Sequence, residues 1–207
     1  MKYREILLNQ LKSMPYFSKG DITALGGQYN LKQTTVDAYI GRSLARKELI
    51  QLRKGLYTTT HFYEANRGDI SYPFYLGNVI RSPSYVSTWA ALQYYNLTTE
   101  AIHGITSVTQ KVTRTYHTKA GHYTYHSIKN GLFSGFSLIK EKFTFFMASP
   151  SKALFDLLYF KTRQFRGIRA KQISTMVNEL RIDLEEMDKK ERNKFYLLIK
   201  DYLENYG

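Results

Sequence analysis

The chain has 207 residues, no cysteine and a formal net charge of +13. The lack of cysteine excludes disulfides, thiolate metal sites and cysteine nucleophiles, and it is typical of a protein in the reducing cytoplasm. Thirty Lys and Arg residues against seventeen Asp and Glu residues favour a polyanionic partner. No run approaches about 18 apolar residues, so we expect no membrane-spanning segment and no membrane partner.

The N-terminal region carries the signals of two short helices separated by a pair of glycines. Ser18 can cap a helix that runs to about Leu25, and Gly26-Gly27 would supply the left-handed backbone of a tight turn. A second helix is expected from about residue 33 to residue 48. Its apolar face is made of Val36, Ile40 and Leu44, and it would pack on an earlier helix that carries Ile6, Leu7 and Leu11.

The opposite face of the second helix is small and polar, which suits insertion into the major groove of duplex DNA. It carries Thr34, Thr35, Ala38, Gly41, Arg42 and Ala45. The small side chains would let the backbone approach the groove, while the hydroxyls and the guanidinium reach base edges or phosphates. Tyr39 and Arg46 flank this face, and Lys32 and Gln33 stand at the start of the helix.

A short basic hairpin follows the second helix. Residues 50–52 and 56–58 alternate like paired strands, and Arg53-Lys54-Gly55 joins them with a glycine where the turn needs a positive φ. Two cations at a hairpin tip suit contact with phosphate or the minor groove. The order of helix, turn, helix and basic hairpin predicts a winged helix-turn-helix, with duplex DNA as the partner. The alternative is an ordinary amphipathic helix followed by a solvated basic turn.

The chain changes character after this hairpin. Residues 60–69 are polar and look irregular, which indicates a linker at 61–70. We therefore expect an α+β protein with a winged helix-turn-helix domain at 1–60 and an α+β domain at 71–207. The second domain is expected to hold a mostly antiparallel sheet with flanking helices.

Two Ser-Pro pairs predict helix starts in the second domain. Ser82 would cap a helix that begins at Pro83 and runs to about Tyr95, and Ser149 with Pro150 would begin another. Between them, residues 103–148 follow a period of two, which predicts four or five strands broken at Gly121, at Asn130-Gly131 and at Gly135. Residues 143–148 alternate in a way that predicts a strand covered on both faces. The C-terminus predicts a helix whose buried stripe is Phe195, Leu198, Ile199, Tyr202 and Leu203.

Three blocks of sequence carry a family resemblance. They are residues 53–57 (RKGLY), residues 81–98 (from RSPSYVS to NLT) and residues 148–156 (ASPSKALFD). In this order they resemble the AbiEi antitoxin family of type IV, abortive-infection toxin–antitoxin systems. The resemblance implies an antitoxin that represses its own promoter, commonly at inverted repeats, and that neutralises a cognate nucleotidyltransferase-type toxin. It also implies that Thr34, Thr35, Arg42, Arg53 and Lys54 bind the operator.

No pattern in the chain predicts an enzyme or a bound cofactor. Asp188-Lys189-Lys190 has a nuclease-like form, but it lies in a dense charge run without a companion acidic residue on a preceding strand. A metal site at His117, His122 and His126 is conceivable, although surface histidines are the better interpretation. Eighteen tyrosines leave open a C-terminal domain that stacks unpaired RNA bases, and core packing is the alternative.

Overall fold

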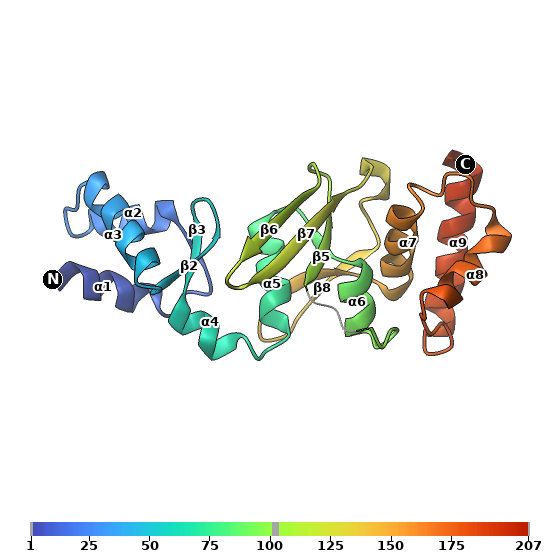
Figure 1. The fold of residues 1–207 in the computed structure, drawn as a ribbon, viewed down its shortest axis with the longest axis horizontal. Coiled ribbons are helices and arrows are strands. Elements are labelled where there is room, and N and C mark those ends of the chain that lie inside the picture. The colour runs from blue at the N-terminus through green and yellow to red at the C-terminus, as the bar shows by residue number, and fades with distance from the viewer. Residues whose placement is uncertain (1, 101–103, 207) are drawn as a thin grey trace. The chain divides into compact units, whose positions relative to one another are not determined.

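The computed structural model of the protein describes residues 2–100 and 104–206. The chain divides into two compact units (Figure 1). The N-terminal unit comprises residues 1–73 with 116–122, and the C-terminal unit comprises residues 74–115 with 123–207. Helices and strands are mixed along the chain, so the α+β class is confirmed. Within the described ranges, no helix is both long enough and apolar enough to cross a membrane.

The N-terminal unit combines helices with a small antiparallel sheet. Its elements are α1 (Lys2–Leu11), β1 (Phe17–Ser18), α2 (Lys19–Gly27), α3 (Gln33–Ala45), β2 (Leu49–Arg53), β3 (Leu56–Thr59) and α4 (Thr60–Asn66). The strand order is β1-β3-β2, and both pairings are antiparallel. β1 was not predicted, because two residues are too few to show a period. The core of this unit is made of Leu7, Leu11, Phe17, Ile22, Val36, Tyr39, Ile40, Leu49 and Tyr57.

Ser18 caps α2 as predicted. Its hydroxyl accepts from the amide of Asp21 at 3.1 Å, and the carboxylate of Asp21 accepts from the amide of Ser18 at 2.6 Å. This reciprocal pair satisfies two backbone donors that the first turn of a helix otherwise leaves free.

The prediction for the two glycines is wrong. Both lie in α2 and neither has a positive φ; the left-handed residue of the turn is Asn30, with φ 55°. A Cβ at Gly26 would lie 2.9 Å from Cγ2 of Val36. Gly26 therefore permits the close approach of α2 to α3 rather than a change of backbone direction.

The predicted irregular segment after the hairpin contains α4. Thr59 caps this helix by accepting from the amide of Phe62 at 3.0 Å, and the side-chain amide of Asn66 donates to the carbonyl of Phe62 at 2.8 Å. The polar composition of residues 60–69 predicted a linker rather than a helix. The residue that caps the helix, Thr59, is also the last residue of β3.

The remaining elements build a six-stranded sheet with helices. They are α5 (Ser71–Ile80), β4 (Tyr85–Val86), α6 (Thr88–Tyr94), β5 (Ile105–Thr109), β6 (Arg114–Thr118), β7 (Gly121–Ser127), a 3₁₀ turn (Asn130–Leu132), β8 (Phe136–Ile139), β9 (Phe145–Ala148), α7 (Pro150–Lys161), α8 (Ala170–Glu179) and α9 (Lys189–Tyr206). The strand order is β6-β7-β5-β4-β9-β8. β4 pairs antiparallel with β5 and β8 with β9, whereas β4–β9 and β5–β7 are parallel. The sheet is therefore mixed, and its parallel pairings were not expected.

The predicted helix from Pro83 to Tyr95 is only partly correct. Tyr85 and Val86 form β4, and the helix begins at Thr88. Val86 pairs with Ser107 of β5 on one side and with Met147 of β9 on the other. These long-range pairings override the local Ser-Pro helix signal.

The prediction for β9 also needs correction. Phe145 and Met147 are buried on one face, but Phe146 on the other face is 43% exposed. The strand is therefore not covered on both sides along its whole length. The amide of Phe146 donates to Oδ1 of Asn78 in α5 at 2.5 Å, which anchors this strand to a helix.

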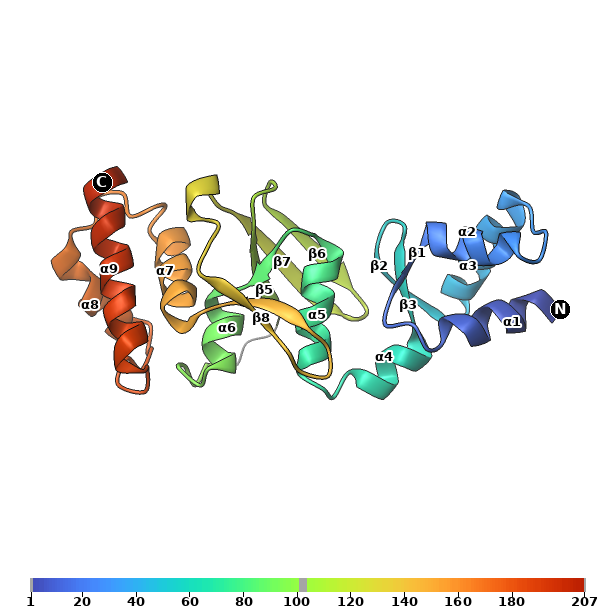
Figure 2. The same cartoon turned by 180° about the vertical axis from the view of Figure 1, so that it is seen from behind.

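The C-terminal helices follow the predictions more closely. Ser149 caps α7 by accepting from the amide of Lys152, and Phe195, Ile199 and Tyr202 of α9 are buried. Leu198 and Leu203 are partly buried against the same core. Figure 2 shows α7, α8 and α9 packed beside one another. Helices α5 and α8 were not predicted.

Candidate nucleic-acid interface

α3 has one buried face and one exposed face. Val36 and Ile40 lie in the core, at 0% and 6% exposure. The exposed face, with the residues just before it, comprises Lys32, Gln33, Thr34, Ala38, Gly41, Arg42, Ala45 and Arg46, with Thr35 half-buried. Apart from its chain neighbours and the backbone of α3 itself, no atom lies within 4 Å of the Cβ position at Gly41, so the helix surface is open there. The period of 3.6 residues thus places the predicted residues on one accessible surface.

Tyr39 is an exception to this placement. It is 4% exposed and belongs to the core of the N-terminal unit, so the prediction that it flanks the exposed face is wrong. Burial raises the pKa of its hydroxyl. Tyr39 lies three residues after Val36, on the same stripe of the helix, and its large ring gains more from burial than from exposure. Its ring packs in the core on the buried side of α3, away from the exposed face.

Asp37 also lies on the exposed face of α3, although it was not predicted to belong to it. Its carboxylate binds Nζ of Lys19 at 2.8 Å and accepts from Nε2 of Gln33 at 2.9 Å. The hydrogen bond from Lys19, followed by that from Gln33, lowers the pKa of Asp37. Because α2 supplies Lys19, the one acidic group on the predicted face of α3 is matched by a cation, and Gln33 is held in place. The helical period already placed Asp37 next to Thr34, so this residue could have been found.

The basic hairpin forms as predicted. β2 and β3 pair antiparallel, with a register shift between Gln51 and Arg53. Gly55 has φ 78°, which confirms the need for glycine at the turn. Arg53 and Lys54 are both exposed, and Nη1 of Arg53 donates to the carbonyl of Lys54 at 3.3 Å. The tip therefore presents two cations to solvent from the same unit that carries α3.

Two acidic residues of the charge run near the C-terminus, Asp183 and Asp188, accept from nearby backbone amides. Oδ1 of Asp188 accepts from the amide of Lys190 at 2.8 Å, at the start of α9. Oδ1 of Asp183 accepts from the amide of Glu185 at 2.9 Å. Both contacts are local turns in which a carboxylate accepts from a backbone amide two residues further along the chain.

The three histidines do not converge. Nδ1 of His117 lies 2.6 Å from Nδ1 of His122, whereas His126 stacks on Phe160, and burial lowers the pKa of His126. Among the described residues, no group of three or more His, Cys, Asp and Glu is arranged to hold a metal ion.

Many of the tyrosines are buried, some of them in the two cores. The buried ones are Tyr39, Tyr57, Tyr72, Tyr85, Tyr123, Tyr125, Tyr159 and Tyr202. Of these, Tyr72 donates to the carbonyl of Pro15 and Tyr125 to the carbonyl of Gly77. Rings used in this way are not available to stack on bases.

Comparison with known proteins adds no assignment to this geometry. No model of a known protein family matches the chain, and no curated protein matches it.

Proposed function

We propose that the N-terminal unit is a winged helix-turn-helix that binds duplex DNA and represses the chain's own promoter. The observation that carries this proposal is the exposed face of α3, which lies in the same small unit as the basic tip of the β2–β3 hairpin. α3 would enter the major groove, and the hairpin would contact phosphate or the minor groove.

The side chains divide into groups that read bases and groups that bind phosphates. Ala38, Gly41 and Ala45 keep the centre of the face shallow, so that the backbone can approach the floor of the groove. Arg42 is the residue we assign to a guanine edge, because a guanidinium can donate two parallel hydrogen bonds to one base. The second group, assigned to phosphates, contains Lys32, Thr34, Thr35, Arg46, Arg53 and Lys54.

We also propose that the C-terminal unit neutralises a nucleotidyltransferase-type toxin. Support comes from the sequence resemblance, whose second and third blocks both lie in this unit. Those blocks build β4, α6 and α7, which surround one core. They supply the framework of the unit.

Fluorescence anisotropy with the purified full chain tests the DNA half of the proposal. The probes are the chain's own upstream duplex, a scrambled duplex and single-stranded RNA of equal length. We expect a preference for the upstream duplex of about 10³ or more. Equal affinity for all three probes would overturn the repressor assignment, and a preference for RNA would favour an RNA-interacting effector instead.

Co-expression tests the toxin half separately. We expect the product of the adjacent reading frame to arrest growth alone and to be harmless in the presence of this chain. A variant with Arg42, Arg53 and Lys54 changed to Ala should lose repression and keep neutralisation. Growth arrest that this chain does not relieve would remove the antitoxin assignment and leave the DNA-binding assignment standing.

A further inference from the structure

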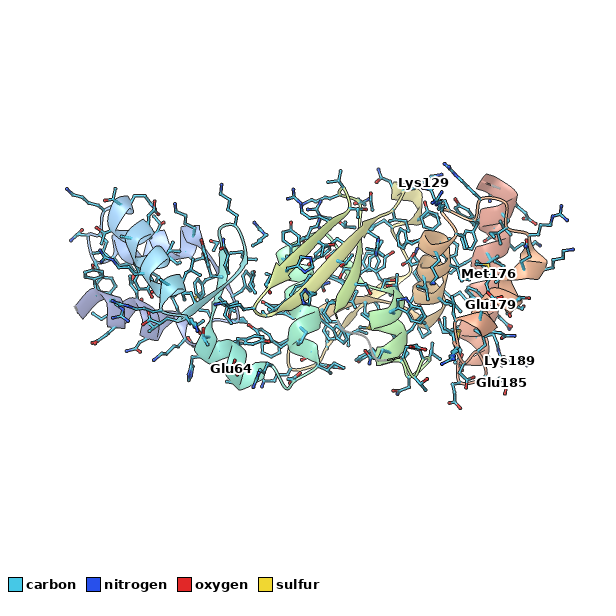
Figure 3. All side chains as sticks on the ribbon, in the orientation of Figure 1. Glu64, Lys129, Met176, Glu179, Glu185 and Lys189 are labelled. Atoms are coloured by element: carbon cyan, nitrogen blue, oxygen red, sulfur yellow. The ribbon has the colours of Figure 1, made fainter. Side chains whose placement is uncertain are left out.

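The segment that joins α7 to α8 carries a dense run of positive charge with no acidic residue. Residues 161–171 hold five cations and no acidic residue, and no acidic residue occurs between Asp156 and Glu179. The cations are Lys161, Arg163, Arg166, Arg169 and Lys171, and all five are exposed. Glu179 lies at the other end of α8 (Figure 3). We call this surface the α7–α8 basic loop.

The backbone of the loop is held in an uncommon conformation. Arg163, Gln164 and Phe165 are consecutive left-handed residues, with φ of 50°, 69° and 57°. Residues other than glycine rarely adopt this conformation, and successive ones persist only where the surroundings impose it.

Phe165 anchors this part of the loop in the core of the C-terminal unit. Its ring is 3% exposed and packs 5.5 Å from the ring of Phe155 and 5.4 Å from that of Tyr202. Its amide donates to the hydroxyl of Thr162 at 2.8 Å, and the amide of Gln164 donates to the carbonyl of Tyr159 at 2.7 Å. The burial of Phe165 and these two hydrogen bonds hold the loop against the core. Arg163 and Arg166, on either side of Phe165, are therefore exposed on a segment whose backbone is held in place.

The cations of the loop are not neutralised by the protein. Within residues 2–100 and 104–206, no ion pair involves any of the five. Other cations of the C-terminal unit do have carboxylate partners: Lys152 binds Asp156, and Lys194 binds Glu191. Cations without carboxylate partners that lie close together in sequence raise the local positive potential and favour an anionic partner.

We propose that the α7–α8 basic loop binds the phosphodiester backbone of nucleic acid. An acidic protein surface is the less suitable partner, because protein interfaces depend on a buried apolar or aromatic anchor. The apolar residues of the loop are Phe165, which is buried, and Ile168, which is half-buried. Guanidinium groups instead match the paired oxygens of a phosphate. The proposal is independent of the DNA-binding face of α3, since the loop belongs to the other unit.

The test compares two triple variants of the full chain that lose the same charge. R163Q/R166Q/R169Q changes the loop, and K140Q/K189Q/K190Q removes three exposed cations from other parts of the C-terminal unit, including Lys189 at the start of α9 (Figure 3). Binding to a random-sequence duplex DNA and to the matching duplex RNA is measured across a salt series. Thermal unfolding is followed for every variant.

The loop variant should bind nucleic acid about tenfold or more weakly at low salt, and the slope of log K against log salt should become shallower by about 2 to 3. The control variant should change much less. R166Q/R169Q leaves the left-handed residues unchanged, so it should show about two-thirds of this effect even if the triple variant unfolds. The nucleic acid, DNA or RNA, whose affinity falls more in the loop variant is the one whose phosphates the loop binds.

Two results would overturn the proposal. Equal losses in the loop and control variants would mean that net charge alone governs binding. Displacement of nucleic acid by poly-glutamate as effective as that by unlabelled duplex would assign the loop to an acidic protein instead.

Discussion

Lys152 and Asp156 form an ion pair inside the core of the C-terminal unit, one turn apart on α7. Nζ of Lys152 lies 2.6 Å from Oδ1 of Asp156, and the two side chains are 3% and 0% exposed. The other carboxylate oxygen accepts from the hydroxyl of Tyr85 at 3.0 Å and from that of Ser87 at 2.7 Å. Burial raises the pKa of Asp156, and the charge of Lys152 opposes that shift. Every group of this network has a partner, which makes the network costly to disrupt.

Replacing Lys152 with Met should destabilise the protein by about 3–5 kcal/mol, because it leaves the Asp156 carboxyl buried without its cation. Urea unfolding measures the change. The double variant K152M/D156L should recover much of the loss, since it removes both charges. Lys189→Met at an exposed position is the control. A loss for Lys152→Met no larger than that of the control would contradict this account.

Arg42 is the residue on which sequence discrimination should depend. Replacing Arg42 with Ala should cost about 1–3 kcal/mol on operator DNA if its guanidinium reads a base, because the lost hydrogen bonds are specific to that base. Anisotropy titrations on operator and random duplex measure the difference. Arg67→Ala, at the residue directly after α4, is the matched control; this arginine pairs with Glu64 of α4 at 2.9 Å, and Figure 3 labels Glu64. Equal losses on both duplexes would make Arg42 a phosphate contact.

At the scale of elements, a side chain of α9 caps the start of α7. Oε2 of Glu191 accepts from the amide of Ser151 at 3.0 Å and from its hydroxyl at 2.6 Å. An acceptor with negative charge at a helix N-terminus satisfies a free donor and interacts favourably with the helix dipole. This contact joins two helices through residues that lie forty positions apart in sequence. Partial burial acts to raise the pKa of Glu191, but the hydrogen bonds from Ser151 outweigh it and the pKa is lowered.

This shift predicts a pH dependence of stability. Because the folded-state pKa of Glu191 lies below its unfolded value near 4.5, the contribution is complete above pH 4.5 and is lost as the pH falls through the folded-state pKa. Glu191→Gln should lower stability at neutral pH and flatten the acid limb of a stability–pH profile. Glu204→Gln, which changes an exposed carboxylate of the same helix, is the control. Parallel acid limbs for the wild type and Glu191→Gln would exclude the cap as the source.

For the molecule as a whole, the positive charge is spread over both units. Residues 1–60 hold ten basic and four acidic residues, and residues 149–207 hold twelve and nine. The two proposed contact surfaces, the α3 face and the α7–α8 basic loop, lie in different units, so each can be altered separately.

Binding to the upstream duplex should therefore depend steeply on salt. If about 6–10 phosphates are neutralised, the slope of log K against log salt should be roughly −5 to −9, because each neutralised phosphate releases condensed counterions. Titrations at several salt concentrations measure it. A slope shallower than about −2 would mean that few phosphates are contacted, which contradicts both proposed surfaces.

Features that depend on neighbours in sequence were predictable. The caps at Ser18 and Ser149, the positive φ of Gly55 and the buried stripe of α9 each require only residues within two turns or one hairpin. Local hydrogen bonds and helical period act over that distance, so the sequence alone determined these features. The same period placed Thr34 and Arg42 on one accessible face.

Features that depend on distant partners were decided by the tertiary structure. The segment after Pro83 became β4 because β5 and β9 pair with it, and Gly26 serves the contact with Val36 rather than a turn. Tyr39 went into the core, where its ring replaces water with packing contacts. No local pattern predicted that Lys152 and Asp156 are buried together, because the hydroxyls that bind Asp156 come from Tyr85 of β4 and from Ser87, about seventy residues earlier. Long-range pairing and desolvation supply the free energy in each case, and neither is encoded in a local pattern.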